Sequence, residues 1–239
     1  MRHRRRRWLR VKRGVGRHHD SAVAVGSGLN EGIVIHGYHV VWGAYGFWLP
    51  NDPRGSWSDF VGSWELVKFG RTTRSIERRD IEPSRWAAWR ATAIQSLRYP
   101  PLELDGRQAR AVGAGLAVGA NKSHLTIWAC SILPEHVHLI VARHTYKVEQ
   151  ICNLLKGEAT KQLKRESLHP QQRFQRPDGK LPSMWAEGQW KVYLDTEEAI
   201  ESAIHYVEEN PIKEGKPPQK WSFVTPFAGL DRSGWTTYH

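Results

Sequence analysis

The amino-acid sequence predicts an α+β fold, with a four-stranded antiparallel sheet, helices on one face and one extra helix near the C-terminal end. Three observations predict it. Apolar runs rich in β-branched and aromatic residues alternate with segments whose apolar residues recur at helical spacing. Dense turn sequences separate these segments. The order of the core elements, without the helix expected in the insertion 56–100, is strand, helix, strand, strand, helix, strand, helix, which is the ferredoxin-like βαββαβ arrangement with an added helix.

Four apolar segments are expected to form the strands. The first covers about residues 35–45, is rich in Val, Tyr and Trp, and ends at the turn-rich stretch 49–56. A hairpin should follow, because the runs 125–131 and 137–142 are joined by a short link that contains proline. The fourth strand is short, at residues 189–194.

Three helices are expected before the last strand. The first covers residues 82–97 and has Pro83 in its first turn, where proline is tolerated. Asp105 can cap a second, which runs to about Gly119 although its glycines lower the helix propensity. The clearest helix covers residues 147–165, because its apolar residues form a single stripe.

The last helix should begin after a cap at Asp195 or Thr196 and end at Asn210, because Pro211 follows. Tyr206 and Asn210 are four residues apart and therefore share one flank of this helix.

Composition indicates the compartment and the class of partner. The net charge of +11 favours an anionic partner, with nucleic acid first, although most of this charge lies in the first 19 residues of the segment 1–31. These residues are expected to be a disordered basic arm and linker. A single domain should cover 32–216, with 56–100 as an insertion and 217–239 as a tail. Two cysteines with apolar neighbours and no long apolar run predict a cytoplasmic protein without a membrane partner.

His136 and His138 lie two residues apart on a predicted strand, so both side chains should point to the same face. Two imidazoles can share one divalent ion, and an amide oxygen such as that of Asn210 would suit Mg²⁺ or Mn²⁺. A nearby Tyr206 could then attack a phosphodiester and form a phosphotyrosine. The plainer alternative is a half-buried tyrosine and an asparagine that simply ends its helix.

Three segments carry a resemblance to a known family. The stretch around His136 and His138 resembles the His-hydrophobic-His signature of HUH single-strand DNA nucleases. Residues 203–215 (AIHYVEENPIKEG) resemble the catalytic helix of single-tyrosine transposases, in the branch associated with repetitive extragenic palindromes (REP). Residues 37–56 resemble the first strand and loop of that branch.

The resemblance implies a role for each matching residue. His136 and His138 would be metal ligands, Tyr206 the nucleophile and Asn210 the third ligand. Tyr193 is a rival nucleophile that fits the family helix less well. His39, on the first strand, is expected to be an ordinary sheet residue.

The function implied is that of a metal-dependent single-stranded DNA endonuclease and strand transferase, which acts beside DNA hairpins or palindromic repeats through a 5′-phosphotyrosine. The protein would be bacterial, nucleoid-associated, and a monomer or homodimer. Two alternatives remain open: a domesticated hairpin-binding protein that does not cleave, and a simple metal phosphodiesterase. Candidate phosphate contacts are Lys156, Lys161 and Arg54, although the lysines could equally form a solvated basic face and Arg54 a salt bridge within its turn.

Overall fold

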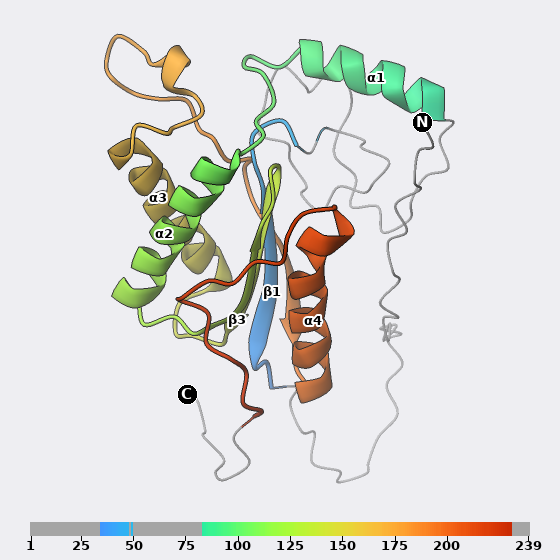
Figure 1. Ribbon diagram of the computed structural model, residues 1–239, viewed down its shortest axis with the longest axis vertical. Coiled ribbons are helices and arrows are strands. Elements are labelled where there is room, and N and C mark those ends of the chain that lie inside the picture. The colour runs from blue at the N-terminus through green and yellow to red at the C-terminus, as the bar shows by residue number, and fades with distance from the viewer. Residues whose placement is uncertain (1–33, 48, 50–82, 231–239) are drawn as a thin grey trace, which may run out of the picture. The chain divides into compact units, whose positions relative to one another are not determined.

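The computed structural model describes residues 34–47, 49 and 83–230, and the order of strands and helices is the predicted one (Figure 1). The elements in chain order are β1 (Gly37–Gly43), α1 (Pro83–Gln95), α2 (Gly106–Lys122), β2 (Ile127–Ile132), β3 (His136–Ala142), α3 (Val148–Arg165), the short 3₁₀ helix η2 (Gln172–Phe174), β4 (Trp190–Leu194) and α4 (Glu197–Lys213). The predicted arm at 1–31, Arg54 and much of the predicted insertion lie outside the described residues.

The four strands form one antiparallel sheet in the order β2-β3-β1-β4. This is the strand order of the ferredoxin-like arrangement, so the predicted fold class is confirmed. β1 and β3 lie in the middle and pair over their whole lengths, with Val41 opposite His138 and Gly43 opposite His136. The strand that carries the histidines is therefore held on both sides by backbone hydrogen bonds.

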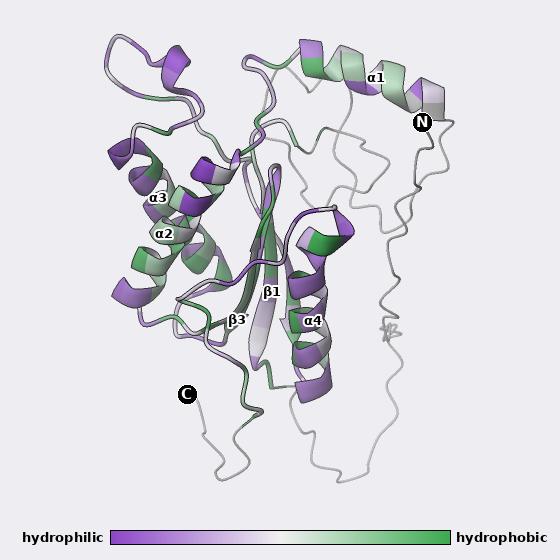
Figure 2. Ribbon diagram, in the orientation of Figure 1, coloured by the Kyte–Doolittle hydropathy of each residue, from purple (hydrophilic) through white to green (hydrophobic). Residues whose placement is uncertain are grey.

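The two faces of the sheet are covered by different helices. Val137, Leu139 and Val141 of β3 belong to the main apolar core, which α2 and α3 complete. The residues between them point to the opposite face, where Ile140 packs with residues of α4. Figure 1 shows the sheet between α2 and α3 on one side and α4 on the other. In Figure 2, α4 is a mixture of hydrophilic and hydrophobic residues, as expected for a helix with one buried side.

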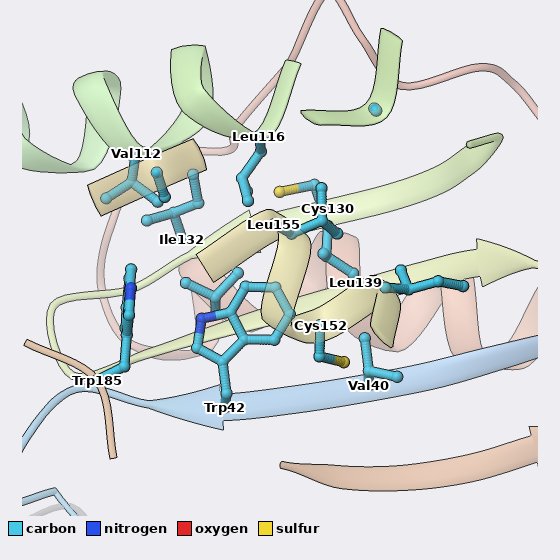
Figure 3. Packing of buried hydrophobic residues seen from close by; sticks show 14 of the residues in the cluster. Val40, Trp42, Val112, Leu116, Cys130, Ile132, Leu139, Cys152, Leu155 and Trp185 are labelled. Atoms are coloured by element: carbon cyan, nitrogen blue, oxygen red, sulfur yellow. The ribbon is translucent and has the colours of Figure 1, made fainter. Parts of the chain in front are cut away.

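The core between the sheet and α2 and α3 is tightly packed (Figure 3). Trp42 of β1 lies beside Cys152 and Leu155 of α3 in this cluster. Cys130 and Cys152 are buried free thiols, as predicted. None of the helices among the described residues is long and apolar enough to span a membrane.

The helix ends agree with the predicted caps but not with the predicted stop. Asp105 caps α2 with a full capping box, and Thr196 rather than Asp195 caps α4. The prediction that Pro211 ends the last helix is wrong, because α4 continues to Lys213 with Pro211 inside it. A proline in the last turn removes only one backbone donor. The N–H of Glu214 still donates to the carbonyls of Asn210 and Pro211 and closes the helix.

The segment after α4 runs along the outer edge of β2. The side chain of Gln219 bonds both to the N–H and to the carbonyl of Ile132, each at 2.8 Å. Val224 forms a parallel bridge with Ile127 at the other end of the strand. These contacts satisfy backbone groups that an edge strand would otherwise expose.

Candidate active site

The histidine pair lies on β3 as the strand period predicts. His136 and His138 are both buried, with ring centroids 4.8 Å apart and ring planes at 70°. Phe47, shortly after β1, stacks on His136 with the centroids 4.8 Å apart and the planes within 10°. Backbone pairing of β3 and this aromatic contact hold the two imidazoles in place.

Helix α4 brings a tyrosine to the same face of the sheet. Ile200 and Val207 of α4 are fully buried and pack with Ile140 of β3. This packing turns the flank that carries Tyr206 toward the histidines. The ring of Tyr206 lies edge-on to that of His138, with the centroids 5.8 Å apart and the planes at 62°.

Asn210 follows Tyr206 by one helical turn and shares its flank of α4. Its side chain is buried, and no described residue offers its Nδ2 a hydrogen-bond partner. Buried amides without a partner are uncommon in folded proteins. Asn210 therefore lies on the predicted flank of α4, and its amide is in the protein interior.

The structure adds to the site a residue, His39, that was expected to be an ordinary residue of the sheet. His39 of β1 is buried, and its Nε2 lies 3.1 Å from Nδ1 of His138. Its ring also contacts Tyr206 at 5.8 Å and Trp190 at 5.1 Å between centroids. The sequence feature that could have pointed to His39 is a histidine within an apolar, β-branched run. The strand register that brings it to His138 is not visible in the sequence.

Burial keeps His39 and His138 uncharged near neutral pH. Desolvation lowers the pKa of His138 well below its ordinary value, and the nearby His136 and His39 lower it further. Desolvation also lowers the pKa of His39 to about 4. Both imidazoles are therefore neutral at pH 7, the form in which histidine binds metals.

The phenol of Tyr206 is also held in its neutral form. Burial, with a smaller contribution from Glu214, raises its pKa to about 12. The ammonium of Lys213 lies 5.4 Å from the centroid of its ring. At neutral pH the phenol of Tyr206 therefore keeps its proton.

The side chains present fit a small divalent ion. The Nε2 of His138 and the Oγ of Ser131, its cross-strand neighbour, are buried, and no described residue offers either a hydrogen-bond partner. Within the part of the chain that the structure describes, no three His, Cys, Asp or Glu side chains gather to hold a metal. The predicted ligands, which are the two imidazoles and the amide oxygen of Asn210, would leave water or substrate oxygens to complete the shell of an ion, a set that suits Mg²⁺ or Mn²⁺.

The rival tyrosine lies on the other face. Tyr193 of β4 is exposed and pairs in register with Tyr38, which packs against the main core. Their rings are 5.7 Å apart in an edge-to-face contact. Of the two candidate nucleophiles, Tyr206 is the one whose ring meets the histidines.

The candidate phosphate contacts lie away from the histidines. Lys156 was expected on an exposed basic face, but it is buried, and its Nζ donates to the carbonyls of Ala186 and Gly188. This placement corrects the expectation, because the side chain turns inward and its Nζ lies 5.8 Å from the centroid of the Trp42 ring. Lys161 is exposed and ion-paired with Glu158. Both lysines are on α3, across the sheet from the histidine pair.

Comparison with known proteins agrees with the predicted resemblance. Residues 104–210 match the family of IS200-like transposases, and this segment contains both histidines of β3, Tyr206 and Asn210. The resemblance is therefore confirmed over that segment. No curated protein is similar enough to match.

Two solved structures resemble the fold. One is a REP-associated tyrosine transposase bound to a REP hairpin, with 12% identity and a TM-score of 0.40, covering 87% of this chain and 98% of the other. The second is a putative transposase from Deinococcus radiodurans R1, with 12% identity and a TM-score of 0.32, covering 77% of this chain and 97% of the other.

Proposed function

Because residues 104–210 match the family of IS200-like transposases, we propose that this protein is a metal-dependent endonuclease and strand transferase for single-stranded DNA. The observation that carries the proposal is the contact between Tyr206 and His138. A nucleophile from α4 and a metal ligand from β3 meet on one buried face, and both lie within the matched segment.

The reaction would be a transesterification at phosphorus. The Oη of Tyr206 forms a new bond to the scissile phosphorus, and the bond to the 3′ oxygen of the preceding nucleotide breaks. The leaving oxygen ends as a 3′-hydroxyl, and the tyrosine carries the 5′-phosphate of the downstream strand. One phosphodiester replaces another, so a 3′-hydroxyl can later attack the adduct and rejoin DNA without ATP.

Each side chain has a distinct part in this proposal. His136, His138 and Asn210 would hold Mg²⁺ or Mn²⁺, which supplies charge stabilisation to the phosphate oxygens. Burial positions Tyr206 and keeps its phenol protonated until substrate is bound, because its pKa is about 12. The ammonium of Lys213, 5.4 Å from the centroid of the phenol ring, would favour a developing phenolate by charge attraction.

The substrate is proposed from the resemblance of residues 203–215 to the catalytic helix of REP-associated transposases. We propose that the protein cuts beside a hairpin, where unpaired bases are accessible for stacking and for direct contacts. Palindromic repeats flanking the gene would supply the natural target.

The decisive experiment tests for a covalent adduct. A labelled hairpin oligonucleotide with single-stranded flanks is incubated with Mn²⁺ or Mg²⁺ and the full chain, and adducts are resolved under denaturing conditions. The wild type and the control Tyr193→Phe should form an adduct that chelation of the metal prevents. Tyr206→Phe should form none, because it lacks the attacking oxygen.

Other outcomes would identify a different function. Cleavage by Tyr206→Phe equal to that of the wild type would favour a simple metal phosphodiesterase. Retarded migration of the hairpin with no adduct in any divalent metal would favour a hairpin-binding protein that does not cleave.

A further inference from the structure

His39 of β1 makes a contact that the proposed reaction does not yet use. Its Nε2 is 3.1 Å from Nδ1 of His138, the hydrogen bond that joins the two middle strands through their side chains. His39 lies outside the segment that matches the transposase family. Its place in the site therefore comes from the tertiary structure alone.

The chemistry of imidazole limits how this hydrogen bond can be arranged. A neutral imidazole carries one N–H, and the other nitrogen has the lone pair. The Nε2 of His138 is buried and has no hydrogen-bond partner among the described residues, so it is the nitrogen left for a metal. Binding through Nε2 requires the proton of His138 on Nδ1, and the acceptor that faces this proton is Nε2 of His39.

The ring of His39 is held from two further sides. The ring of Tyr206 lies 5.8 Å away and that of Trp190 5.1 Å away, both in edge-to-face contacts. The backbone of His39 is fixed in the middle of the sheet, where it pairs with Ile140 and Val192. The acceptor nitrogen therefore occupies a fixed position relative both to the ligand His138 and to the nucleophile.

We propose that His39 is a positioning residue whose Nε2 accepts the Nδ1–H of His138 and so fixes the tautomer and orientation in which Nε2 of His138 binds the metal. The inference rests on the proposed function for the existence of the metal, but the tautomer can be observed without it. Partners of this kind typically change metal affinity 10–100-fold when they are removed.

Three variants separate positioning from packing. His39→Leu removes the acceptor and keeps an apolar side chain, whereas His39→Gln can place an amide oxygen near the former position of Nε2. His169→Leu is the matched control, because His169 is another buried histidine, in the loop after α3.

The first measurement uses the metal-free protein. Nitrogen-15 NMR of labelled histidines, with His138 assigned by substitution, reports which ring nitrogen carries the proton. We expect the Nδ1–H tautomer of His138 in the wild type, in His39→Gln and in His169→Leu, and a mixture of tautomers in His39→Leu. A wild-type His138 protonated on Nε2 would overturn the inference, whatever the variants do.

The second measurement is Mn²⁺ affinity, by electron paramagnetic resonance of the free ion. His39→Leu should bind Mn²⁺ about 10–100-fold more weakly, and His39→Gln and His169→Leu should stay within about 3-fold of the wild type. Equal affinity of His39→Leu and the wild type would overturn the inference and leave the proposed function intact. No binding to the wild type would instead overturn the metal-dependent function, and with it the role of His39 in metal binding. Loss of Mn²⁺ affinity in both His39→Leu and His39→Gln would also overturn the positioning role of His39, because the amide oxygen of glutamine should serve as the acceptor.

Discussion

Tyr206 of α4 meets His138 of β3 edge-on, with 5.8 Å between the ring centroids. The two residues reach each other because α4 packs on the face of the sheet to which the histidines point. Ile200 and Val207 form that packing with Ile140 and Ala129. The candidate site therefore depends on how firmly one helix is attached, and this can be measured.

Ile200→Ala should destabilise the protein by about 2–5 kcal/mol, because a fully buried isoleucine leaves a cavity between α4 and the sheet. Ile212→Ala is the matched control on the same helix, and should change the free energy of unfolding by less than about 0.5 kcal/mol because Ile212 is 56% exposed. Denaturant unfolding of both variants checks this. Equal effects would mean that α4 does not pack on the sheet through Ile200.

Gly115→Ala should also destabilise, although alanine is the better helix former. A Cβ at Gly115 would lie 2.5 Å from the Cα of Ala159 and 2.7 Å from the carbonyl oxygen of Glu158. Backbone atoms cannot move aside as a flexible side chain can, so α2 and α3 would have to separate. Gly157→Ala, with nothing within 4 Å of its added Cβ, should instead stabilise by about 0.5–1 kcal/mol. Opposite signs in thermal or denaturant unfolding are the expected result.

Lys156 should make the free energy of unfolding depend on pH in the alkaline range. Burial lowers its pKa in the folded protein from 10.5 to about 8, so between these values the unfolded chain binds more protons. The free energy of unfolding contributed by this residue should therefore rise with pH from about 8 to 10.5, by at most about 3 kcal/mol at 1.36 kcal/mol per unit.

The comparison for Lys156 is the variant Lys156→Met, which keeps an unbranched side chain beneath Trp42. Urea unfolding at pH 7 and at pH 10.5 gives the difference between wild type and variant at each pH. The free energy of unfolding of the wild type should increase relative to that of the variant as the pH increases. A difference that stays constant would show that Lys156 remains fully charged in the fold.

Gln219→Ala should loosen the edge of β2. The side chain bonds both backbone groups of Ile132, and its loss leaves them without these partners, at a cost of about 1–3 kcal/mol. Hydrogen exchange should show faster exchange at the Ile132 amide in this variant. Gln95→Ala, on an exposed position of α1, should leave that amide unchanged. Unchanged protection in both variants would contradict the role assigned to Gln219.

Local patterns were enough to predict much of the fold. Capping at Asp105, the two strands of the hairpin and the apolar stripe of α3 involve residues close together in the sequence, so propensity and period indicate them. The end of α4 was predicted wrongly because Pro211 falls in its last turn, where few hydrogen bonds remain to be lost. The glycines of α2 weakened its prediction, and only tertiary contacts explain three of them: Gly115 and Gly119 lie against α3, and Gly113 lies against Trp221.

The sequence by itself determined that His136 and His138 share a face and that Tyr206 and Asn210 share a flank, because both follow from the period of a single element. Only the tertiary structure decided that this face and this flank meet, that His39 bonds His138, and that Lys156 is buried. Those relations depend on strand register and helix packing between distant segments, and a local pattern carries no record of which surfaces come together.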